Sequence, residues 1–169
     1  MSARGQDGPG AADAAIKRWD GLRVVGQRDF PGIAQSVGAA RKWVLELLDG
    51  HATAEALETL ELLVSEVVTN AILHSDSARP GGLVRVRVGL GDSLIHIEVI
   101  DDGSATSAPA IRTTDDDSLS GRGLSWVNLL ASTWGSSQNE ETGGTVWFQL
   151  GQSPSHQDTI PLPPGEGSQ

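Results

Sequence analysis

The sequence contains no cysteine among its 169 residues, which excludes disulfide bonds, thiolate metal sites and thiol nucleophiles. Basic residues are also scarce, since 12 lysines and arginines stand against 22 aspartates and glutamates, a formal net charge of -10. This negative charge argues against sequence-independent binding to nucleic acid phosphates. The four histidines are too scattered to suggest a metal cluster. An anionic ligand would therefore have to be held by a local arrangement of residues.

Long apolar runs are missing as well. No stretch approaches the roughly 20 apolar residues that a membrane-spanning helix needs. The first residues lack the apolar core of a signal peptide. We therefore expect a cytoplasmic protein with no membrane partner, and the lack of cysteine fits that expectation.

The length suits one domain with a single core. Residues 1–20 are rich in glycine, alanine and aspartate without periodicity, and residues 151–169 carry prolines among polar residues. These compositions are typical of segments that bury little apolar surface. We expect a flexible N-terminal tail at 1–20, one folded domain at 21–150 and a disordered tail at 151–169.

The order of the expected elements indicates the fold class. Alternating apolar residues predict strands, and apolar residues spaced by three and four predict helices. Strands are expected at residues 22–25, 83–90, 94–101, 133–137 and 145–150, and helices at about 32–48, 53–74 and 121–132. The polar stretch 103–120 is long for a connection and is a candidate lid, whose acidic run 115–117 we interpret as solvated. The order predicts an α+β two-layer sandwich, with a mixed, mostly antiparallel sheet and helices on one face.

A polar row runs beside the apolar stripe of the expected helix 53–74. Glu66, Asn70 and His74 are spaced by four, so they stack along one line of the helix. A solvated helix face would explain the row. However, asparagine is a poor residue for the middle of a helix, and a carboxylate with an amide oxygen one turn away suits Mg²⁺. Both interpretations stay open at this point.

Asp101 continues the inward-facing row of the strand 94–101. Side-chain alternation places Asp102 on the opposite face, outward with His96 and Glu98. A carboxylate at the end of a buried strand face needs a donor. That donor is either the backbone of the turn before Gly103 or a ligand amine such as that of adenine.

Two glycine-rich turns are the remaining irregularities. Gly121, Arg122 and Gly123 open an expected helix, where backbone N–H groups and the helix dipole favour an anion. Gly144 and Thr145 stand at the mouth of the last strand. Alone, each turn is weak evidence for a ligand site. A plain loop-to-helix turn explains the first equally well, and a hairpin turn explains the second.

The order of these four features resembles the ATP-binding domain shared by sensor histidine kinases, heat-shock-90 chaperones, gyrase and mismatch-repair ATPases, with the Bergerat ATP-binding fold. The resemblance covers roughly residues 30–150. The chain departs from that family where Ala105 replaces the second glycine of the Asp-x-Gly-x-Gly motif. Within the family, the stretch 64–74 is most similar to bacterial anti-sigma-factor serine/threonine kinases.

The resemblance implies ATP and Mg²⁺ as ligands and assigns roles on the helix and the strand. Glu66 would be the general base, and Asn70 would bind Mg²⁺. Asp101 would bind the adenine amine, with Gly103 allowing close approach of the ring and Thr145 supporting Asp101 or a bridging water. The role of His74 is open, since a histidine at a helix end also caps carbonyls.

At the expected helix start, Gly121 and Gly123 would donate backbone N–H groups to the phosphates, and Arg122 would add positive charge. The implied partners are a sigma factor and a small antagonist protein phosphorylated on serine or threonine, and the class suggests a homodimer. A regulatory module that binds nucleotide without phosphate transfer remains the alternative, as does an interaction domain with no ligand.

Overall fold

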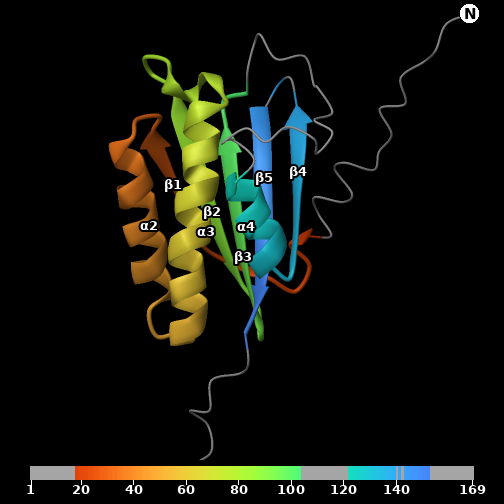
Figure 1. The fold of residues 1–169 in the computed structure, drawn as a ribbon. Helices are drawn as coiled ribbons and strands as arrows, with labels where there is room; N and C mark the ends of the chain where they lie inside the picture. Colours follow the sequence, from red (N-terminus) through yellow and green to blue (C-terminus); the bar gives the residue numbers. More distant parts are fainter. Residues whose placement is uncertain (1–17, 104–121, 140, 142, 153–169) are drawn as a thin grey trace, which may run out of the picture.

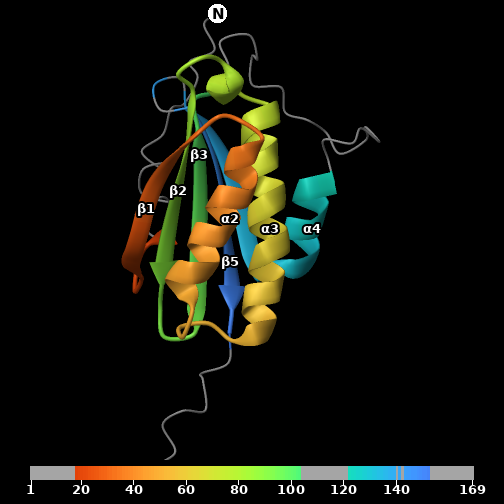
Figure 2. The same ribbon diagram turned by 90° about the vertical axis from the view of Figure 1, so that its left-hand side faces the viewer.

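The computed structural model describes residues 18–103, 122–139, 141 and 143–152. The predicted α+β sandwich is confirmed (Figures 1 and 2), with a five-stranded sheet in the order β1-β2-β3-β5-β4 and helices α2, α3 and α4 on one face. All four strand pairs are antiparallel, so the sheet is less mixed than predicted. The elements are β1 (Arg23–Pro31), α2 (Gln35–Leu48), α3 (Ala54–Leu73), a 3-10 turn (Asp76–Ala78), β2 (Leu83–Leu90), β3 (Leu94–Asp101), α4 (Arg122–Leu130), β4 (Thr133–Asn139) and β5 (Gly143–Gly151).

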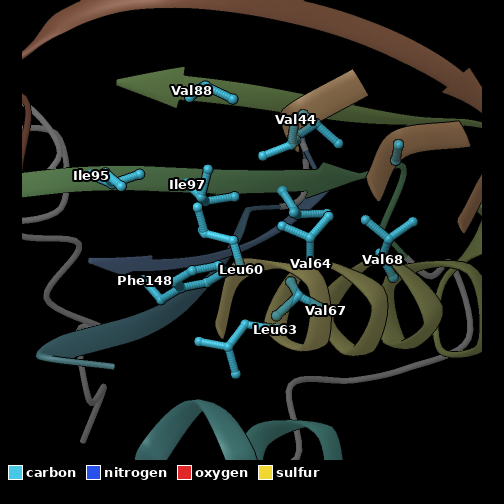
Figure 3. Packing of buried hydrophobic residues seen from close by; sticks show 14 of the residues in the cluster. Val44, Leu60, Leu63, Val64, Val67, Val68, Val88, Ile95, Ile97 and Phe148 are labelled. Carbon is cyan, nitrogen blue, oxygen red and sulfur yellow. The ribbon is translucent and has the colours of Figure 1, made fainter. Parts of the chain in front are cut away.

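The core lies between the sheet and α2 and α3 (Figure 3). Alternation on β2 and β3 points one apolar row of each strand at the helices, as predicted. The α3 stripe fills the space opposite that row. Fully buried side chains include Leu60, Leu63, Val64, Val67 and Val68 from α3 and Val84, Val86, Val88, Ile95 and Ile97 from the sheet.

Helix α3 begins and ends within one residue of the predicted positions. Thr53 is its N-cap and accepts a hydrogen bond from the backbone N–H of Ala56 at 3.2 Å. At the same end of the molecule, Gln152 donates to the carbonyl of His51 at 3.0 Å and accepts from the N–H of Thr53 at 3.2 Å. The residue after β5 therefore fastens the α2–α3 connection to the end of the sheet.

The first strand is longer than predicted. Residues up to Pro31 pair with β2, whereas the sequence predicted a strand at 22–25 only, followed by a helix from about residue 32. The polar middle of β1 obscures alternation because it faces solvent at a sheet edge. Proline is tolerated there, since an edge strand has one side without a ladder partner.

His96 and Glu98 lie on the outer face of the sheet, as the alternation predicted. Both are nevertheless buried. Trp19 stacks edge-on against the His96 ring at 4.5 Å between centroids, and Arg18 lies 3.5 Å from Glu98. Two residues assigned to the tail by composition therefore cover part of this face.

The predictions for residues 1–17, for the lid 103–120 from residue 104 on and for the tail 151–169 from residue 153 on fall outside the described residues. Of the helices in the described part, none has the length and apolarity to cross a membrane.

Candidate functional site

Asp101 is the last residue of β3 and lies at the end of the sheet where β5 begins (Figure 1). Its Oδ1 accepts two backbone hydrogen bonds, from Gly103 at 2.7 Å and from Gly144 at 3.0 Å. Its Oδ2 accepts no hydrogen bond within the part of the chain that the structure describes. One oxygen thus caps the turn, while the other keeps the acceptor capacity that a ligand amine requires.

Three glycines pack around Asp101 so closely that side chains would not fit. A Cβ at Gly144 would lie 2.9 Å from both carboxylate oxygens, and one at Gly143 would overlap the Asp101 carbonyl oxygen. Gly103 and Gly143 also adopt positive φ angles of 71° and 83°. The glycines therefore leave the carboxylate in a cradle of backbone. Gly143 was not among the predicted site residues, although the Gly-Gly pair in the sequence was its signal.

The ionisation of Asp101 reflects this environment. Burial raises the pKa of its carboxyl above the ordinary value of 3.8. The N–H groups of Gly103 and Gly144 oppose that rise because they stabilise the charged form, and the neighbouring Asp102 adds to it. The net raised pKa indicates a carboxylate that is incompletely solvated, so a ligand donor would stabilise it further.

The polar row on α3 ends at the same end of the molecule as β3 (Figure 1). Glu66 and Asn70 are half-buried, and His74 is exposed as the C-cap residue. Hydrogen bonds and ion pairs to these three side chains are absent from the described residues. The backbone N–H of His74 donates to the carbonyl of Asn70 at 3.0 Å, which closes the last turn. The site roles of Glu66, Asn70 and His74 stay predictions.

The helix predicted after the glycine turn is α4, which packs against α3 (Figure 2). Arg122 and Gly123 form its first residues, and Gly121 lies outside the described part. A helix that starts here offers backbone N–H groups and a positive dipole end. The phosphate-binding role of these three residues stays a prediction.

Thr145 follows Gly144 in β5 and pairs with Ile100 of β3. No hydrogen bond joins Thr145 to Asp101 among the residues described, and the N–H of Gly144 contacts the carboxylate instead. Support of Asp101 by Thr145 through a water stays a prediction.

Sequence reasoning missed Ser77, a fully buried residue in the turn after α3. Its hydroxyl donates to the carbonyl of Leu83 at 2.8 Å and accepts from the N–H of Asp102 at 3.0 Å. The turn that contains Ser77 therefore contacts the residue next to Asp101. The nearby glycines Gly32 and Gly82 were the only signal in the sequence, because both pack on the Ser77 carbonyl.

The described residues thus form a two-layer α+β sandwich with a glycine-framed carboxylate at one end of the sheet and a polar helix row that ends on the same side. A model of the histidine kinase-like ATPase domain matches residues 30–150, more than half of the chain. The chain therefore belongs to the histidine kinase-like ATPase family, and the resemblance stated from the motifs is confirmed.

Similar curated proteins are anti-sigma F factors. The chain is 27% identical to that of Bacillus cytotoxicus over 124 residues, 69% of this chain and 85% of the relative. It is 37% identical to that of Geobacillus sp. (strain WCH70) over 75 residues, 44% of this chain and 51% of the relative. The match to the protein of Geobacillus stearothermophilus is 39% over 51 residues, 30% of this chain and 35% of the relative. The matched part thus spans about a third to a half of the Geobacillus proteins.

Proposed function

We propose that this protein binds ATP with Mg²⁺ and transfers the γ-phosphate to a serine or threonine of a small antagonist protein, while also binding a sigma factor. The family membership supports nucleotide binding. The names of the relatives, anti-sigma F factors, support a sigma factor as partner. The single observation that carries the proposal is the Asp101 carboxylate, which has one oxygen satisfied by backbone and one that accepts no hydrogen bond from the described residues.

The residues fit an adenine nucleotide on two counts. The glycines at 103, 143 and 144 keep side chains away from the carboxylate, since a Cβ at Gly144 would lie 2.9 Å from both of its oxygens. No group of three His, Asp or Glu side chains in the described ranges could hold a metal ion by itself. In phosphoryl transfer Mg²⁺ usually takes phosphate oxygens as further ligands beside a few protein oxygens.

Each side chain has a task that its chemistry allows. The Asp101 Oδ2 would accept a hydrogen bond from the exocyclic amine of adenine. The amide oxygen of Asn70 is a hard ligand for Mg²⁺, which when bound would neutralise phosphate charge. The carboxylate of Glu66, one turn earlier on α3, would take the proton of the attacking hydroxyl, a task worth about 10²–10⁴-fold in rate.

The test of the kinase proposal is transfer of labelled γ-phosphate to candidate antagonist proteins by wild type and by Glu66→Gln. We expect transfer to fall by about 10²–10⁴-fold in the variant, with ATP affinity nearly unchanged, because the base acts only in the reaction. The exposed Glu58→Gln on the same helix is the control. Transfer at the wild-type rate in Glu66→Gln would remove Glu66 from the role of base.

A second candidate is a regulatory module that binds nucleotide without transferring phosphate. The observation in its favour is Ala105 at the position of the second motif glycine. Single-turnover assays with excess protein and several candidate partners separate the two functions. ATP binding without any product would favour the regulatory module.

A further inference from the structure

The turn between α3 and β2 joins the two halves of the proposed site. On the side of β3, the hydroxyl of Ser77 accepts from the N–H of Asp102 at 3.0 Å, and the N–H of Asp76 donates to the carbonyl of Gly103 at 2.6 Å. Asp102 in turn accepts from the N–H of Leu83 at 2.7 Å. Both residues that follow Asp101 are therefore held by this turn and the start of β2.

The same turn is tied to the last turn of α3. The Ser75 hydroxyl donates to the carbonyl of Ala71 at 2.6 Å and accepts from the N–H of Ser77 at 3.0 Å. Ala71 is the neighbour of Asn70 in the helix. A continuous series of short hydrogen bonds thus runs from the Asn70 region, through Ser75 and Ser77, to the residue beside Asp101.

Ser77 has no room to change position. It is fully buried, and its hydroxyl donates to the carbonyl of Leu83 and accepts from the N–H of Asp102. A Cβ at Gly32 or at Gly82 would overlap the Ser77 carbonyl oxygen, so the two neighbouring segments press directly on its backbone. Such close backbone packing makes the turn a rigid spacer.

We infer that Ser77 is a positioning residue that fixes the distance between the Mg²⁺-binding side of the site on α3 and the adenine-binding Asp101 on β3. The inference rests on the proposed function. Bound nucleotide must reach both sides at once, and only Mg²⁺ links its phosphates to Asn70. Loss of the Ser77 hydrogen bonds therefore reduces the increase in nucleotide affinity that Mg²⁺ causes. The contact between adenine and Asp101 stays in place.

The experiment is a titration of the full chain with ADP, once with Mg²⁺ and once with EDTA, for wild type and Ser77→Ala. We expect the ratio of the two affinities to fall by about tenfold in Ser77→Ala, while the affinity in EDTA stays within about twofold. Thr53→Ala is the control, since it removes the cap at the opposite end of α3 and weakens the helix without touching the spacer.

An unchanged ratio in folded Ser77→Ala would overturn the inference, as would an equal loss in Thr53→Ala, which would reduce Ser77 to a stabilising residue. Should Ser77→Ala fail to fold, Ser77→Cys keeps the shape with a weaker donor and acceptor, and an unchanged ratio there would overturn the inference equally. Wild type that binds no nucleotide would instead refute the proposed function. Wild type that binds equally well in Mg²⁺ and in EDTA would refute the role of Asn70 and this inference with it.

Discussion

Gly144 donates its backbone N–H to the carboxylate of Asp101 at 3.0 Å, and a Cβ on this glycine would lie 2.9 Å from both carboxylate oxygens. The contact joins the first residues of β5 to the last residue of β3, 43 positions apart. The orientation of the carboxylate therefore depends on the absence of a side chain at Gly144.

Gly144→Ala is expected to lower ATP affinity by about tenfold or more and the free energy of unfolding by about 1–3 kcal/mol, because the added methyl must displace the carboxylate. Isothermal titration and urea unfolding measure the two effects. The matched control is Gly38→Ala in α2, where the nearest neighbouring atom would be 3.8 Å away. That change should leave ATP affinity alone and raise stability by up to about 1 kcal/mol. If Gly144→Ala bound ATP with wild-type affinity, the claim that Gly144 must lack a side chain to position the Asp101 carboxylate for ATP would be wrong.

Asp101→Asn should bind ATP about 10- to 100-fold more weakly, which is the scale of one charged hydrogen bond. The amide oxygen would take over the backbone bonds from Gly103 and Gly144, so the NH₂ group would face the ligand amine, donor against donor. Titration with ATP is the measurement, and the exposed Asp92→Asn at the opposite end of the sheet is the control.

The same substitution should not destabilise the fold at neutral pH. Because the pKa of Asp101 is raised above 3.8, the native state holds its proton to a higher pH than the unfolded chain, so its ionisation costs stability as the pH rises through the raised pKa. Asparagine removes that cost. Thermal melts at pH 7 should place the variant at or above wild type, and a large loss of stability would show that Asp101 has a structural task.

His96 should make the protein sensitive to mild acid. Burial lowers its pKa from 6.5 to about 4, and the charges of Arg18 and Arg87 add to the effect. The native state therefore binds fewer protons than the unfolded chain, and stability is lost as the pH falls from 6.5 towards 4. The expected loss between about pH 7 and pH 5 is on the order of 2 kcal/mol.

Urea unfolding at the two pH values tests this in wild type and in His96→Gln. The variant should lose most of the acid dependence, whereas the exposed His51→Gln should keep it. An acid dependence in His96→Gln equal to that of wild type would assign the effect to other groups.

Arg85 and Asp29 form a two-pronged ion pair between β2 and β1, with nitrogen–oxygen distances of 2.6 and 2.9 Å. The pair lowers the pKa of Asp29 and raises that of Arg85. Both side chains are exposed, so solvent screens the attraction. Arg85→Ala should therefore lower the free energy of unfolding in urea by less than about 1 kcal/mol. This loss should be smaller in 1 M salt, where the Debye length is only about 3 Å and the attraction is screened. A cost that salt leaves unchanged would point to packing by the arginine stem.

Strands and helices that bury one face and expose the other could be predicted from the sequence, because their apolar residues recur at a regular spacing. The hairpin β2–β3 lies at the predicted residues because one face of each strand packs on α3 and keeps a strict alternation. Helix α3 carries its own cap signal at Thr53. Strand β1 was predicted too short, since its exposed edge position imposes no apolar pattern on residues 27–29.

The features that could not be predicted depend on contacts between segments far apart in the sequence. Arg18 and Trp19 return to the outer face and pack on Glu98 and His96, beside Arg87 and Trp147 of the sheet, an arrangement that no local pattern encodes. Asp101 was singled out from alternation along its strand, and its ligand-binding role stays a prediction beside the backbone contact with Gly144. Ser77 could not be found in the same way, because its importance lies in partners 6 and 25 residues away that only the folded chain brings together.

The Gln152 contacts with His51 and Thr53 lie at the end of the molecule opposite Asp101 (Figure 1). Gln152, at the end of the described chain, is therefore held at the far side of the fold from Asp101. A probe placed at this end of the sheet lies away from the site. This layout makes the C-terminal side the natural point of attachment for binding sensors built on this domain.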